Sequence, residues 1–369
     1  MKRRDFVRTL GGASLATGGL VAACGRREEQ PSTDSPMSGA RHHWKMVTTW
    51  PRNFPALGTG ANRLAALIGE MSGGRIQVKV YGDGELVSAF EVFDAVSRGT
   101  AEMGHGSAYY WKGKIPAAQF FSTVPFGFTA DEMNAWLYHG GALDIWREVY
   151  EPFGLVPAPA GNTGVQMGGW FNKEINSLAD LSGLKMRIPG LGGEVLARAG
   201  GTPVNLPGGE IFIALQSGAI DATEWVGPYN DLAFGLYKAA RYYYYPGWHE
   251  PGTTLECIIN KAAFDKLSKD LQAVVLSACE AVNQDMLSEM IARNGVALGT
   301  LLDEHHVVLR RFPDDVLEKL RTLSGEVVAE LAEQDPLARR IYESYSKFRK
   351  QVLAWGKLSE VAYLQARNG

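Results

Sequence analysis

Near the start of its folded part, the chain alternates apolar strands with amphipathic helices. Residues 44–50 (WKMVTTW) have the character of a strand, 61–71 carry apolar residues at helical spacing, and 75–81 alternate apolar and polar residues. A second amphipathic helix is expected over 85–98 and a short buried strand over 102–106. The order strand, helix, strand, helix, strand predicts an α/β layer on a mainly parallel sheet.

A second set of strands and helices follows and predicts a second lobe. Strands are expected over 155–160, 167–172, 185–188 and 202–206, with helices between the later ones. The helical stretch 270–303 keeps one side apolar over a length well above the ~11–12 residues of an average helix. Such a helix could span both lobes and support them from behind.

These patterns assign the chain to two lobes that exchange segments. The first lobe is expected to comprise 44–164 and 255–302, and the second 165–254 and 303–369, which includes the C-terminal helices. Two α/β lobes with no catalytic motif between them suggest a protein that binds a ligand in a cleft.

The N-terminal segment has the features of an export signal rather than of the fold. Arg3 and Arg4 precede a short stretch rich in Gly and Ala, so residues 1–23 are predicted to be a twin-arginine (Tat) signal peptide. The sequence before Cys24 (LVAAC) resembles a lipobox and predicts a lipid anchor on this thiol; the alternative is plain cleavage after residue 23, with Cys24 incidental. Residues 24–43 are expected to be a flexible tether, and the protein periplasmic.

Composition excludes several classes of protein. The 369 residues carry a net charge of −3, which disfavours non-specific nucleic-acid binding, and no apolar run of about 20 residues follows the N-terminus. No Walker A loop, Rossmann fingerprint, Gly-x-Ser-x-Gly elbow or His-Glu-x-x-His motif occurs. Cys257 and Cys279 could form a disulfide in an oxidising compartment, but two separate buried thiols are the favoured interpretation.

The residues with most chemical information lie between 166 and 250. Arg187 stands inside an apolar strand that Pro189 ends, where a guanidinium is costly unless it meets an anion. Glu224 stands beside Trp225 at the exit of a short apolar strand, and Glu250 lies in an aromatic, Pro-rich turn (WHEP). Two carboxylates facing one anionic ligand would repel it unless a hard cation lay between them. The alternatives are a structural ion pair for Arg187 and a position for Glu224 at the rim of the cleft.

At these residues the sequence resembles the periplasmic solute-binding proteins of TRAP (tripartite ATP-independent periplasmic) transporters. The resemblance rests on the runs WKMVTTWP, LADLSGLKMRIPG and ALQSGAIDATEWVGPYND, and it covers nearly all of the mature chain. It implies a two-lobed α/β fold like that of periplasmic binding proteins, with mixed sheets flanked by helices. The run GLGGEVLARAGGTPVNLPGGEI, together with EWVGPYND, is similar to the branch that binds 2-oxo monocarboxylates such as pyruvate with a metal ion.

The resemblance also implies roles for individual residues. Arg187 would pair with the substrate carboxylate, and a sodium or calcium ion would be held by Gln166, Glu224, Glu250 and the main-chain carbonyl of Trp225. The implied substrate-binding set is Gln166, Arg187, Trp225, Tyr110 and Trp50, with the aromatic residues closing over the carbon tail.

The implied partners are a small organic anion and the membrane permease subunits of the transporter. No catalytic role is expected, although a periplasmic metal-dependent enzyme acting on a keto acid is the alternative, and a sensor lobe for a membrane receptor is a third. The long apolar stripe of the last helix, which begins near Leu337, could form a homodimer or pack into the core.

Overall fold

The computed structural model describes residues 41–368, which belong to one compact unit. The predicted signal peptide, Cys24 and most of the predicted tether lie outside these residues. The first strand begins at His42 rather than at 44, because residues 42 and 43 already pair with the neighbouring strand. No helix within 41–368 is both long and apolar enough to cross a bilayer.

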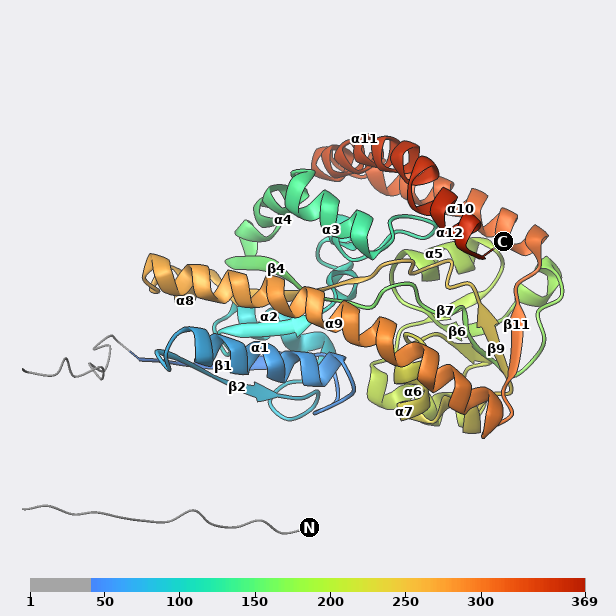
Figure 1. Cartoon of the computed structure of the whole chain (residues 1–369), viewed down its shortest axis with the longest axis horizontal. Coiled ribbons are helices and arrows are strands. Elements are labelled where there is room, and N and C mark those ends of the chain that lie inside the picture. The colour runs from blue at the N-terminus through green and yellow to red at the C-terminus, as the bar shows by residue number, and fades with distance from the viewer. Residues whose placement is uncertain (1–40, 369) are drawn as a thin grey trace, which may run out of the picture. The chain divides into compact units, whose positions relative to one another are not determined.

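Two mixed sheets form the framework of the two lobes (Figure 1). The first has the order β2-β1-β3-β10-β4, and the second has the order β11-β9-β5-β8-β6-β7. The strands of the first sheet are β1 (His42–Thr48), β2 (Ile76–Tyr81), β3 (Met103–Gly106), β4 (Leu155–Asn162) and β10 (Thr254–Asn260). Those of the second are β5 (Gly169–Phe171), β6 (Lys185–Arg187), β7 (Thr202–Val204), β8 (Ala222–Thr223), β9 (Tyr242–Tyr245) and β11 (Val308–Arg311).

Parallel pairing and strand exchange both follow from the sequence pattern. β1 pairs in parallel with β2 and β3, as the alternation of strands and helices predicts, whereas β10 returns from the second lobe and runs antiparallel between β3 and β4. All but the last residue of β10 are buried, including Glu256, because the strand lies between β3 and β4. The prediction of a two-lobed α/β fold with mixed sheets is confirmed.

Helices cover the faces of both sheets. The helices of the first 150 residues are α1 (Leu57–Met71), α2 (Val92–Ser97), α3 (Ala130–His139) and α4 (Ala142–Tyr150), with 3-10 turns η1 (Ala89–Glu91), η2 (Ala108–Trp111) and η3 (Pro116–Phe121). Those that follow are η4 (Glu151–Phe153), η5 (Leu178–Leu181), α5 (Gly190–Arg198), α6 (Gly208–Gln216), α7 (Pro228–Phe234), η6 (Leu236–Lys238) and α8 (Lys261–Asp265). The chain ends with α9 (Lys269–Asp303), α10 (Asp314–Glu333), α11 (Pro336–Leu358) and α12 (Glu360–Asn368).

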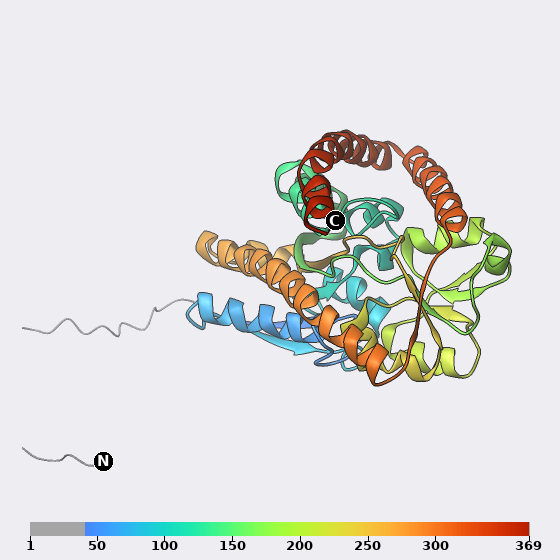
Figure 2. The same ribbon diagram turned by 45° about the vertical axis from the view of Figure 1, so that its right-hand side comes forward.

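The long helix α9 joins the two lobes. It packs against α1 and β4 of the first lobe and against α7 of the second, and Figures 1 and 2 show it running across both. Its buried side recurs at helical spacing, for example at Leu271, Val275 and Val282. The prediction of a long helix spanning both lobes is confirmed.

The C-terminal helices contact both lobes, although the sequence places residues 303–369 with the second. α10 packs on α5 of the second lobe, whereas α11 packs on η3, α3 and α4 of the first. The physical reason is an aromatic cluster, in which Tyr345 of α11 contacts Phe120, Phe128 and Trp136. Cys257 and Cys279 are both free and buried, as the favoured interpretation of the sequence expects.

Candidate functional site

Arg187 is the last residue of β6, and its guanidinium is buried between the lobes. Its side chain is 1% exposed and forms an ion pair through Nη1 with Glu224 Oε1. Nε donates to the carbonyl of Leu206 at 3.1 Å, Nη1 to the carbonyl of Glu224 at 3.3 Å and Nη2 to Tyr110 Oη at 3.4 Å. Burial lowers the pKa of Arg187, but the charge of Glu224 and the neighbouring tyrosines raise it by a larger amount. The net shift of the pKa is therefore upward, and the guanidinium stays charged.

Two acids and a histidine meet beside this arginine. Glu224 follows the two-residue strand β8, while His249 and Glu250 lie in the turn before β10, and all three are buried. Their possible ligand atoms lie within 4.8 Å of one another, and His249 Nε2 is 3.4 Å from Glu224 Oε2. Burial and then the charge of Glu224 raise the pKa of Glu250 to about 7. A cation between the carboxylates would relieve their repulsion.

Gln166 adds an unused acceptor to this cluster. Its Nε2 donates to Glu250 Oε2 at 2.8 Å and to Thr163 Oγ1 at 3.1 Å. Its Oε1 is buried without a hydrogen-bond partner among the described residues, which is costly unless another group binds it. An amide oxygen and two carboxylates are hard ligands of the kind that sodium and calcium prefer, so the residues present fit such an ion.

Aromatic side chains close the site. The Arg187 guanidinium carbon lies 5.2 Å from the ring centre of Trp225, and Trp50 lies 6.2 Å from Trp225 and 6.3 Å from Tyr110, measured between ring centres. The three aromatic side chains and Gln166 line a cavity of about 10 Å³, which has room for about one water molecule. The structure thus brings together every side chain predicted for the site.

Trp50 and the Glu224–Trp225 segment are held by buried polar partners. Trp50 Nε1 donates to His105 Nδ1 at 2.8 Å, and burial lowers the pKa of His105 to about 4, so its ring is a neutral acceptor. Asp231 of α7 accepts from the backbone N–H of Val226 at 3.3 Å and is itself fixed by Trp170 at 2.9 Å. These contacts limit the freedom of the walls of the cavity.

Sequence reasoning missed Tyr109 and His249. Tyr109 lines the same cavity, and burial followed by the charge of Glu250 raises the pKa of its hydroxyl. His249 joins the acid cluster directly. Each is the chain neighbour of a predicted residue, and because η2 and the turn at 246–250 are irregular, side chains of adjacent residues can both face the cavity. Adjacency to Tyr110 and Glu250 was the only available signal.

Two α/β lobes that enclose a buried arginine, two carboxylates and an amide oxygen are typical of a solute-binding protein of the two-lobed type. The sequence model of the bacterial extracellular solute-binding protein family 7 (DctP) matches residues 46–335. The chain belongs to this family. Its members bind solutes outside the cytoplasm and are not enzymes, so the prediction of a binding role is confirmed.

Several relatives bind 2-oxo acids or were solved with pyruvate. The chain is 44% identical over 366 residues to a monocarboxylate 2-oxoacid-binding periplasmic protein of Nostoc sp. strain PCC 7120, which covers 98% of both chains. A TRAP solute-binding protein of Pseudoalteromonas atlantica T6c, solved with sodium and pyruvate, is 44% identical with a TM-score of 0.86, covering 88% of this chain and 99% of that one. One from Colwellia psychrerythraea, solved with calcium and pyruvate, is 45% identical with the same TM-score and coverage.

Proposed function

We propose that this chain captures a small 2-oxo monocarboxylate such as pyruvate, together with a sodium or calcium ion, and delivers it to TRAP permease subunits in the membrane. The observation that carries the proposal is the buried Arg187 beside the acid cluster and Gln166. The amide oxygen of Gln166, Oε1, has no hydrogen-bond partner among the described residues. The binding of pyruvate with sodium or calcium by the two solved relatives supports it.

The charges of the site favour joint binding of cation and anion. Arg187, Glu224 and Glu250 sum to −1 when both acids are ionised, so a monocarboxylate alone would raise the negative charge to −2 in a buried space. A bound calcium ion would bring the sum to zero, and a sodium ion would return it to −1. Gln166, Glu224, Glu250 and the carbonyl of Trp225 would hold the ion, and Arg187 would receive the solute carboxylate in bidentate geometry.

The solute would change the partner of Arg187. In the structure the guanidinium pairs with Glu224. A solute carboxylate that took this place would release Glu224 toward the cation, while Trp50, Tyr110 and Trp225 would cover the carbon tail. Since the cavity is about 10 Å³, the lobes have to separate for the solute to enter.

We propose lobe boundaries at 44–164 with 255–302 and at 165–254 with 303–369, with α11 resting on the first lobe. Contacts between the two lobes support their closure over the site. Lys112 Nζ of the first lobe lies 3.2 Å from Glu194 Oε1 of the second, and Asn230 Nδ2 of the second donates to the carbonyl of Pro55 of the first at 3.0 Å.

Export and assembly complete the proposal. Tat export through Arg3 and Arg4 and a lipid anchor on Cys24 are supported by the sequence. Replacing the two arginines should abolish export, and replacing Cys24 should release the protein from the membrane.

A homodimer through the C-terminal helices is supported by exposed apolar residues there, such as Trp355 at 68% exposed, and by the dimer of a Bordetella bronchiseptica relative that is 37% identical. Light scattering of wild type and Trp355→Ser tests it.

Calorimetry with pyruvate, with and without calcium or sodium, tests the site. Glu250→Gln should weaken pyruvate binding at least 100-fold in calcium, which corresponds to about 3 kcal/mol, because a charged ligand of the ion is lost. Glu256→Gln is the matched control, since Glu256 is equally buried but lies on β10 and contacts Trp111 instead. Wild-type affinity in Glu250→Gln, or no pyruvate binding by the wild type with either ion, would refute the proposal.

A further inference from the structure

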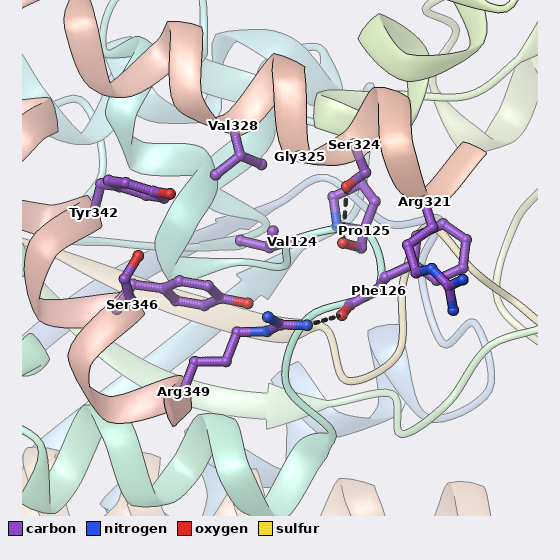
Figure 3. A pocket seen from close by; sticks show the side chains of 11 residues that line it. Val124, Pro125, Phe126, Arg321, Ser324, Gly325, Val328, Tyr342, Ser346 and Arg349 are labelled. Carbon is purple, nitrogen blue, oxygen red and sulfur yellow. Dashed lines mark hydrogen bonds between the residues drawn. The ribbon is translucent and has the colours of Figure 1, made fainter. Parts of the chain in front are cut away.

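A second pocket lies between the C-terminal helices and the turn that follows η3. It has a volume of about 290 Å³, at the lower end of the ~300–1,000 Å³ of small-molecule sites. Its lining comes from the turn 124–126, from α10 and from α11 (Figure 3). It shares no lining residue with the cavity lined by Trp50, Gln166 and Trp225.

Arg349 supplies an available positive charge. Its Nη2 donates to the carbonyl of Phe126 at 3.2 Å, the bond drawn in Figure 3. Within residues 41–368 no carboxylate lies at ion-pair distance from Arg349, whereas Arg321, the other arginine of the pocket, pairs with Glu318. A guanidinium has five N–H donors, so most of those on Arg349 remain available for an anion.

Tyr345 supplies a second unused polar group. Its side chain is 3% exposed, and its hydroxyl has no hydrogen-bond partner among the described residues. Tyr345 and Arg349 lie four residues apart on α11, on the same face of the helix, and both line the pocket. Burial raises the pKa of the Tyr345 hydroxyl, and the positive charge of Arg349 opposes the rise. A buried hydroxyl without a partner is costly, so a carboxylate that accepted from both groups would be stabilised.

The rest of the lining is largely apolar. This apolar lining consists of Val124, Phe126, Val328 and Tyr342. Phe126 has a φ of 55°, a strained value for a residue with a side chain, and its N–H donates to the carbonyl of Trp248 at 2.8 Å. The pocket therefore borders the backbone that leads to Glu250.

We propose that this pocket binds a monocarboxylate with an aromatic or branched apolar body, at a site separate from that of the 2-oxo acid. The single unpaired guanidinium matches one negative charge rather than two, and the Tyr345 hydroxyl donates to the same carboxylate. The body of the ligand lies against Phe126, Tyr342 and the valines.

Titration calorimetry with benzoate, and with neutral benzyl alcohol for comparison, tests the site in the absence of pyruvate. Arg349→Met should weaken benzoate binding at least tenfold, and Tyr345→Phe, which removes only the hydroxyl, about threefold. Arg340→Met is the matched control on the same helix, because Arg340 is 49% exposed and pairs with Glu148, and it should change binding less than twofold. No benzoate binding, equal binding of benzyl alcohol, or binding that Arg349→Met and Tyr345→Phe both leave unchanged would overturn the proposal.

Discussion

The ion pair of Arg187 and Glu224 can be measured in the solute-free protein by a double-mutant cycle. Both side chains are 1% exposed, so their attraction acts in an environment of low effective dielectric. At 4 Å and an effective dielectric constant near 20, two unit charges attract by about 4 kcal/mol, against about 1 kcal/mol in water. Breaking a buried pair by removing one partner costs roughly 3–5 kcal/mol, because a charge remains buried alone.

We expect Arg187→Met and Glu224→Gln each to lower the free energy of unfolding by about 3 kcal/mol or more, and the double variant to lose much less than the sum. The coupling energy should be about 2–4 kcal/mol in urea-induced unfolding with a chelator present. Arg52 and Glu85, which are 48% and 35% exposed, form the control pair, for which the same substitutions should give a coupling below ~1 kcal/mol. If the two cycles gave equal coupling, the buried pair would not exist in the solute-free protein.

Two further predictions concern residues beside the site. Burial raises the pKa of Glu256 to about 7 from 4.5, so its contribution to stability is complete below pH 4.5 and is lost as the pH rises through 7, by roughly 3 kcal/mol in total. Unfolding free energies of wild type and Glu256→Gln should therefore diverge between pH 4.5 and 8, and parallel curves would contradict this. A Cβ on Gly208 would lie 2.6 Å from the Trp225 ring, so Gly208→Ala should weaken pyruvate binding at least tenfold by displacing the indole, whereas the neighbouring Gly209→Ala, whose nearest atom is 4.0 Å away, should not. Equal affinities of the two alanine variants in calorimetry would show that Trp225 does not close the site.

The first lobe could be predicted well because its strands are long enough to show a pattern. β1 and β2 have seven and six residues, β2 alternates apolar and polar residues, and the helix between them has a regular apolar side. The second sheet was harder to predict. β8 has two residues and β5 three, too few for a period, and β5 pairs antiparallel with β8 and β9, which depends on contacts far apart in the chain.

The residues of the site also differ in how far the sequence could predict them. Arg187 and Glu224 were predictable because a charge inside or beside an apolar strand demands a partner. Tyr109 and His249 were not, because they lie in irregular segments where neither helical nor strand spacing tells which side chain faces the cavity. Their placement depends on how η2 and the turn before β10 meet between the lobes, which is a property of the assembled fold.

The structural and functional interpretations of Arg187 are therefore compatible. A salt bridge to a nearby acid was one reading of this residue, and an anion-binding role was the other; the structure contains the salt bridge, with Glu224 as the acid. Without Glu224, the guanidinium of Arg187 would be buried and uncompensated whenever no anion was bound to it, which would be destabilising. Under the proposed function, a solute carboxylate would replace Glu224, and this exchange would be favourable only if a cation received the displaced acid. The coupling energy of the Arg187–Glu224 pair would then set how strongly anion binding depends on the metal ion.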